Sequence, residues 1–218
     1  FTDTLKNMSF IAHWESKGKL VYSTVTFAGY VGSLSGLRQD GFSVTIDTRF
    51  YPGGIGELFY EVIAAIEEKN ATLVAYLTRD ALAKDNDFKS ALKTLSSSEL
   101  IADVYYIMAG TKATEGVVIS RNRHNATNIW MLDPPTRWFE VETNYDHWKP
   151  APWYDDRRQP ANHAMKRMGE SNATINNMFE VVSTKPVLNL QTTYTFLAVP
   201  ATNYLDAYRR YCPFPCVQ

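Results

Sequence analysis

Residues 137–158, which read RWFEVETNYDHWKPAPWYDDRR, hold the densest group of side chains that could do chemistry. An amide can donate a hydrogen bond to a developing oxyanion, and a guanidinium can hold a carboxylate or polarise a carbonyl. One amide, two carboxylates and two guanidiniums fall close together after residue 143: Asn144, Asp155, Asp156, Arg157 and Arg158. This density suggests a site.

The same residues have a purely structural interpretation. Asn144 can begin an Asx turn, and residues 155–158 can form a charge cluster at a helix N-terminus together with surface ion pairs. The residue types alone favour this structural interpretation, so a functional role needs further support.

Other catalytic chemistries find little support in the sequence. The four histidines show no spacing that is typical of a metal site: His13, His124, His147 and His163. No nucleophile elbow is present, and both cysteines look structural. We therefore expect no metal and no cofactor, and the 218 residues contain no convincing nucleophile.

The elements that must position Asn144 read as strands. Residues 137–143 alternate in the manner of a strand that ends at the Asn-Tyr-Asp turn, residues 144–146. This run closes a predicted antiparallel meander of four short strands, residues 101–110, 116–123, 128–133 and 137–145. The strand would deliver the polar groups to a sheet edge.

The remainder of the chain mixes both periods. A hairpin is predicted over residues 8–27 with its turn at 17–19, and Gly29, Gly32 and Gly36 mark chain reversal or close backbone approach. Apolar periodicity predicts helices near residues 58–66, 73–82, 87–95 (capped by Asp85 or Asn86), 159–168 and 175–183. Further strands are predicted at residues 42–50, 192–199 and 204–211. Helices on one side and a meander on the other indicate the α+β class.

The composition allows one domain over residues 1–218 with a sizeable core. Lys and Arg number 22 against 23 Asp and Glu, so no basic field is available to recruit nucleic acid. No apolar run is long enough to span a bilayer, and we expect a signal peptide to have been removed.

Two features favour the secretory pathway. Cys212 and Cys216 bracket a Pro-Phe-Pro loop, which favours a local disulfide in an oxidising compartment over two free thiols. Four N-x-[ST] sequons predict a glycoprotein, with glycans at Asn7, Asn70, Asn125 and Asn172.

Several stretches resemble the β-subunit of the acid ceramidase and N-acylethanolamine-hydrolysing acid amidase family. They are FAGYVG (27–32), IADVYYI (101–107), EGVVI (115–119), TNYDHW (143–148) and DDRR (155–158). The resemblance runs from about residue 2 to the C-terminus. Residues 101–107 and 144–152 lean to the amidase, whereas residues 183–189 and the two cysteines lean to the ceramidase.

This resemblance implies a lysosomal or secreted amide hydrolase that acts on N-acylethanolamines or ceramide. It implies an N-terminal-nucleophile hydrolase fold, an αββα sandwich with two antiparallel sheets between helical layers. By resemblance, Asn144 helps to bind the oxyanion and Arg157 belongs to the same site, while Gly29, Tyr30 and Tyr145 are expected to contact the substrate. The implied partners are an α-subunit from the same precursor, the lipid amide and a membrane surface.

In such enzymes the proenzyme cuts itself so that a Cys becomes the first residue of the β-chain. We expect this Cys upstream of Phe1, which makes residues 1–218 most of the catalytic subunit. Thr48 stands where the family usually has Glu, although Arg49 is kept. The alternatives are a catalytically inactive lipid-binding glycoprotein of the same fold and a subunit of a secreted peptidase.

Overall fold

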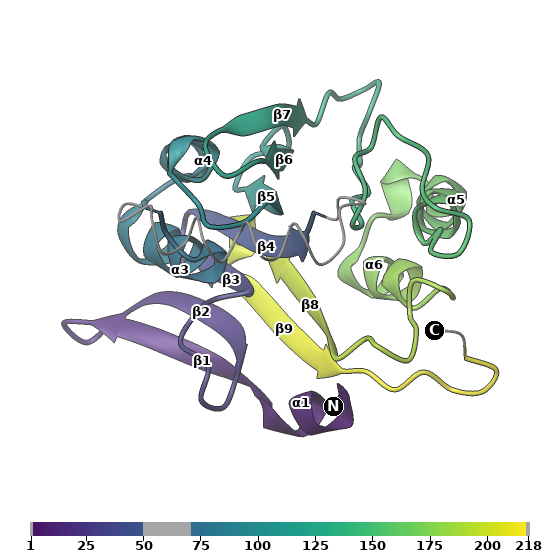
Figure 1. Ribbon diagram of the computed structural model, residues 1–218, viewed down its shortest axis with the longest axis horizontal. Helices are drawn as coiled ribbons and strands as arrows, with labels where there is room; N and C mark the ends of the chain where they lie inside the picture. The colour runs from purple at the N-terminus through teal and green to yellow at the C-terminus, as the bar shows by residue number, and fades with distance from the viewer. Residues whose placement is uncertain (1, 50–70, 217–218) are drawn as a thin grey trace.

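The computed structural model describes residues 2–49 and 71–216 of the 218-residue chain. Seven strands form an antiparallel sheet in which each strand pairs with the next along the chain, from β1 at one edge to β7 at the other (Figure 1). The strands are β1 (Ser9–Ser16), β2 (Lys19–Phe27), β3 (Ser35–Arg38), β4 (Phe42–Thr48), β5 (Val104–Gly110), β6 (Gly116–Arg121) and β7 (Ala126–Met131).

The hairpin predicted over residues 8–27 is confirmed by β1 and β2. Lys17 and Gly18 adopt positive φ angles of 52° and 74°, and Ser16 pairs with Lys19 across them. Two successive positive φ values make a two-residue turn whose twist matches that of the strands. Glycine fits the second position because it has no Cβ to obstruct this conformation.

Two helices, α3 (Val74–Lys84) and α4 (Phe88–Ser97), cover one face of the sheet (Figure 1). Their buried side chains share one core with those of the central strands. Gly36 shows how closely α3 approaches, because a Cβ there would lie 2.5 Å from Leu82 Cδ1. The predicted close approach to the Gly36 backbone is therefore confirmed, and a larger residue there would have to displace the Leu82 side chain.

The predicted cap of α4 is wrong by one or two residues. Asp87 is the N-cap: its carboxylate accepts from the Ser90 N–H at 2.7 Å, and the Ser90 hydroxyl accepts from the Asp87 N–H at 3.3 Å. This capping box needs a polar side chain three residues after the cap. Asp87 has Ser90 at that position, whereas Asp85 and Asn86 would have Phe and Lys.

The opposite face carries a second, two-stranded sheet. The Ser35 Oγ and the Tyr194 hydroxyl lie 3.0 Å apart and join β3 to β8. Helix α6 packs on β8, and α5 packs on α6, so the layers run helices, sheet, sheet, helices (Figure 1). This order confirms the expected αββα sandwich. The remaining elements are α1 (Thr2–Met8), α5 (Arg158–Met168), η1 (Glu170–Asn172), α6 (Ile175–Val182), β8 (Tyr194–Val199), η2 (Pro200–Thr202) and β9 (Tyr204–Arg209).

The fourth strand predicted for the meander is wrong. Residues 138–143 are irregular and belong to neither sheet. Trp138, Phe139 and Val141 pack against Ala164, Met165 and Val181 of α5 and α6 instead. The apolar side chains of this segment are buried, as the pattern predicted. They are buried on helices, however, and burial alone does not require a strand partner.

The C-terminal cysteines confirm the predicted pairing, since Cys212 and Cys216 form a disulfide. Lys185 donates to the carbonyls of Pro213 and Pro215 at 2.6 and 2.5 Å, which ties this loop to the segment after α6. The helix predicted near residues 58–66 lies outside the described residues. Within the described part of the chain, no helix combines the length and apolar character that crossing a membrane requires.

Candidate active site

Asn144 lies where the irregular segment meets the end of β4. Its Nδ2 donates to the Thr48 carbonyl at 2.8 Å, and its Oδ1 accepts from the Arg157 guanidinium at 2.6 Å. The amide is therefore held at both ends, and Nδ2 keeps one N–H for another acceptor. Asn144 and Arg157, both predicted for the site, are in direct contact.

Asp155 holds Arg157 in place. Two guanidinium nitrogens of Arg157 donate to the two carboxylate oxygens of Asp155 at 2.7 and 3.0 Å, and the Tyr145 hydroxyl donates to the second oxygen at 3.0 Å. The bonds from Arg157 hold the pKa of Asp155 below its usual range. Burial and then the bond to Asp155 raise the pKa of Tyr145 to about 12. Asp155 is thus an ionised anchor for Arg157, and Tyr145 is a neutral donor.

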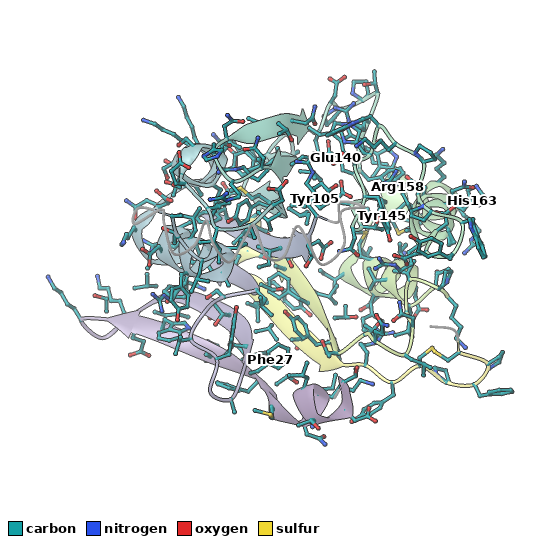
Figure 2. All side chains as sticks on the ribbon, in the orientation of Figure 1. Phe27, Tyr105, Glu140, Tyr145, Arg158 and His163 are labelled. Atoms are coloured by element: carbon teal, nitrogen blue, oxygen red, sulfur yellow. A yellow bond between two sulfur atoms is a disulfide. The ribbon has the colours of Figure 1, made fainter. Side chains whose placement is uncertain are left out.

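Of the four charged residues at 155–158, two have the structural role and two have the site role that the sequence allowed. Asp156 accepts from the N–H of Gln159 at 3.0 Å at the start of α5, which is a structural role. Arg158 donates to the backbone carbonyls of Tyr145 and Lys149 and thereby holds the segment against α5 (Figure 2). Only Asp155 and Arg157 belong to the group around Asn144. The Asn144 side chain forms no Asx turn, because its partners are Thr48 and Arg157.

A cavity of about 1020 Å³ lies beside this group and is lined by strands of both sheets. Gly29, Tyr30 and Asn144 line it, so the structure brings these three predicted site residues to one cavity. Gly29 adopts a φ of 83°, which turns the chain after β2 toward the cavity wall. Tyr145 instead directs its hydroxyl to Asp155. The cavity is large enough for a small organic ligand, and apolar side chains make up much of its wall.

Asp47 also lines this cavity, and the sequence reasoning missed it. Burial raises its pKa to about 6, and the positive charge of Arg157 opposes that rise. One signal was available, since Asp47 is the only acidic residue within the otherwise apolar and hydroxyl-bearing strand β4. The structure adds that this carboxyl faces a cavity rather than bulk solvent.

The neighbours of Asp47 have different roles. Thr48 contributes its backbone carbonyl to Asn144, and it also lines the cavity. Arg49 is buried and donates to Asp146 Oδ1 at 2.8 Å, and the Tyr105 hydroxyl donates to the same oxygen at 2.7 Å. Arg49 thus neutralises a buried carboxylate in the interior.

We expect Arg49→Ala to lower the free energy of unfolding by about 3–5 kcal/mol, because it leaves the buried Asp146 carboxylate without its closest cation. For a chain of this size the melting temperature should fall by roughly 6–20 °C. Thermal unfolding monitored by circular dichroism would measure this change. The matched control is Lys84→Ala, which removes an exposed cation from α3 and should cost less than about 1 kcal/mol. Equal shifts in the two variants would contradict the role of Arg49.

Two further carboxylates lie inside the molecule on the irregular segment. Burial raises the pKa of Glu140 and of Glu142 to about 7 each. Arg137 lies 3.4 Å from Glu140 and the Thr143 N–H donates to Glu142 at 2.8 Å, but neither contact offsets the burial. Both groups are therefore protonated at acid pH and ionise near neutrality.

These shifts predict a protein that is more stable at acid pH. The folded pKa of each group exceeds its usual value of 4.5, so the folded state binds more protons than the unfolded state between about pH 4.5 and 7. Stability should consequently fall as the pH rises through this window. For each group the rise in pKa from 4.5 to about 7 corresponds to at most about 3.4 kcal/mol.

We expect Glu140→Gln to raise the melting temperature at pH 7.5 and to leave it nearly unchanged at pH 4.5, as measured by differential scanning calorimetry. Glu15→Gln, which changes an exposed carboxylate on β1, is the control. A wild-type protein that melts at a higher temperature at pH 7.5 than at pH 4.5 would contradict this account.

The predicted glycosylation sites are placed on the surface where the structure describes them. Asn7, Asn125 and Asn172 are exposed, and Asn70 lies outside the described residues. Across residues 2–49 and 71–216, no group of three or more His, Cys, Asp or Glu side chains is placed to hold a metal ion. Within the same ranges no cysteine is free.

Comparisons with known proteins give a consistent set of relatives. No protein-family model matches the chain. Acid ceramidase from Heterocephalus glaber is 36% identical over 99% of this chain, and N-acylethanolamine-hydrolyzing acid amidase from Cavia porcellus is 40% identical over 93% of it. These matches cover 54% and 56% of the two relatives, so the chain spans about half the length of the curated proteins it matches.

A solved structure agrees with this result. The Caenorhabditis elegans ortholog of N-acylethanolamine-hydrolyzing acid amidase matches with a TM-score of 0.84 at 34% sequence identity. The match covers 95% of this chain and 89% of that chain.

Proposed function

The chain belongs to the family of acid ceramidase and N-acylethanolamine-hydrolyzing acid amidase, and from this we propose that it hydrolyses the amide bond of lipid N-acyl amines. The products would be a free fatty acid and an amine. The observation that carries the proposal is that Asn144 lines the cavity and that Arg157 holds its amide oxygen, which leaves one N–H of Asn144 as a fixed donor there.

These donors suit the oxyanion of amide hydrolysis. When a nucleophile attacks the carbonyl carbon, the electron pair of the C=O bond moves to oxygen, and preorganised donors stabilise that negative charge. The remaining N–H of Asn144 is one such donor, and the Arg157 guanidinium holds the amide oxygen that fixes its orientation. Asp155 in turn keeps the guanidinium in position.

The nucleophile we propose is the thiol of a Cys that precedes Phe1 and is released by autoprocessing, with its α-amine as the base. The thiol forms a C–S bond with the acyl carbon, and the C–N bond then breaks as the amine leaves with a proton. Water hydrolyses the thioester and releases the fatty acid. Support comes from the described cysteines, Cys212 and Cys216, which are both committed to the disulfide.

The irregular segment offers a place for the strand that would begin with this Cys. Glu142 Oε2 and Thr143 Oγ1 are buried and have no hydrogen-bond partner in the described part of the chain. Buried polar groups normally find partners. A strand laid along this segment would satisfy them and would bring its first residue toward Asn144.

The test is an activity assay on the full-length precursor after incubation at acid pH. Release of fatty acid from an N-acylethanolamine and from a ceramide is measured by mass spectrometry at pH 4.5, beside a panel of peptides. We expect hydrolysis of at least one lipid amide and none of the peptides. Binding of the lipid without turnover would favour the inactive glycoprotein, and cleavage of peptides alone would favour a peptidase subunit.

We further propose a secretory, lysosome-directed glycoprotein that remains associated with an α-subunit from the same precursor. The disulfide and the exposed sequons Asn7, Asn125 and Asn172 support this location. Peptide mass spectrometry of native material should find glycans on these residues and no free thiol at Cys212 or Cys216. Unmodified Asn at all sequons together with free thiols would contradict the location.

A further inference from the structure

One wall of the large cavity is polar although most of the cavity is apolar. Thr45 and Asp47 lie two positions apart on β4 and both line the cavity. Ser35 pairs with Thr45 across β3 and β4, and their hydroxyl oxygens are 2.9 Å apart. The Tyr194 hydroxyl reaches the same Ser35 oxygen at 3.0 Å from the other sheet. Three hydroxyls therefore form a chain on the wall that also carries the Asp47 carboxyl.

The hydroxyls are satisfied by one another, but the carboxyl is not. Among residues 2–49 and 71–216, no donor forms a hydrogen bond to Asp47, and Arg157, whose positive charge lowers its pKa, is already bound to Asp155 and Asn144. Glu142 and Tyr194 also interact electrostatically with Asp47, and neither side chain brings a positive charge. A carboxyl in such a place gains most from a ligand that donates a hydrogen bond.

The chemistry of the proposed substrates indicates which part of the ligand can donate. An acyl chain has no donor and would strip water from Asp47 without replacement, which is unfavourable. The amine half carries the amide N–H and, in amino alcohols, a hydroxyl on the carbon next to the one that bears nitrogen. Asp47 immediately precedes Thr48, whose carbonyl holds Asn144. Asp47 and Asn144 also line the same cavity, so one ligand there can contact both residues.

We infer that Asp47 is a specificity-determining residue that accepts a hydrogen bond from the hydroxyl of the amine half of the substrate. The inference rests on the proposed amide hydrolysis and deepens it, because it assigns recognition of the amine half to one named side chain. The hydroxyls of Ser35, Thr45 and Tyr194 extend the polar wall along which such a group lies.

The test compares two substrates with the same acyl chain, the amide of 2-aminoethanol and the amide of ethylamine, on the processed full-length enzyme. The wild type should prefer the hydroxylated amide in kcat/KM. At the acid pH of the assay Asp47, whose pKa is about 6, is protonated, so Asp47→Ala should reduce this preference by about 2- to 10-fold, the range for one hydrogen bond between neutral groups. The loss should appear mainly in KM for the hydroxylated amide, and Asp47→Asn, which keeps an acceptor of the same shape, should retain part of the preference.

The control for Asp47→Asn is Asp80→Asn, which makes the same substitution on the outer surface of α3. It should leave the preference for the hydroxylated amide intact. The inference is overturned if Asp47→Ala leaves the preference unchanged. If the alanine variant does not fold, Asp47→Asn and Asp47→Leu take its place, and an unchanged preference in both overturns the inference. If the wild type hydrolyses neither amide, the proposed function fails, and calorimetric binding of the same two amides decides the inference separately. A binding preference that Asp47→Ala abolishes supports it, and equal binding of the two amides by the wild type overturns it.

Discussion

Asn144→Ala is expected to lose about 100- to 1,000-fold in kcat, the range for removal of one oxyanion donor. The substitution removes the N–H that we assign to the developing negative charge, and that charge exists only in the transition state. KM should therefore change little compared with kcat. Steady-state kinetics on an N-acyl amide at acid pH would measure both parameters.

Asn144→Asp is the matched variant for this prediction. It keeps an oxygen that can accept from Arg157 but lacks both N–H groups, so it separates the donor from the link to Arg157. We expect a loss in kcat similar to that of the alanine variant. Circular dichroism would verify that both variants fold. Wild-type kcat in a folded Asn144→Ala enzyme would remove the role given to this residue.

Arg157→Ala is the second variant for which we expect a large effect, with a lower kcat and a higher KM. Arg157 orients Asn144, and it also supplies the positive charge that opposes the rise in the pKa of Asp47. Its removal should thus misplace the oxyanion donor and make Asp47 harder to ionise. Arg157→Lys keeps the charge but loses the planar fork that binds both oxygens of Asp155, and we expect it to recover only a small part of the activity.

A double-mutant cycle tests whether the two residues act together. If Arg157 works by holding Asn144, the double variant Asn144→Ala with Arg157→Ala should be little worse than the more damaging single variant. Losses that simply multiply would show that the contact at 2.6 Å has no functional consequence. Full activity in Arg157→Ala would return this residue to a surface ion pair.

Local patterns in the sequence predicted most of the fold. The hairpin depended on a Lys-Gly turn and on strand alternation, and helices α3, α4, α5 and α6 each have an apolar stripe or a cap that a short window contains. The failure at residues 138–143 has a clear cause. Alternating residue types predict a strand, but the adjacent side chains of Trp138 and Phe139 both pack on the two helices.

Local sequence patterns also indicated part of the candidate site. Asn144, Asp155 and Arg157 fall within one short stretch, so their density could be noticed without any knowledge of the fold. Their roles could not be assigned from density alone, because a turn and a helix start use the same residue types.

The sequence by itself determined most of the elements, the cysteine pair and the candidate residues around Asn144, because each depends on neighbours along the chain. Only the tertiary structure decided that Asn144 meets Thr48, which lies 96 positions away, and that Asp47 faces the same cavity. Which strand end lies beside which segment depends on how sheets and helices pack. That packing is set by the whole core, and no short window of the sequence contains it.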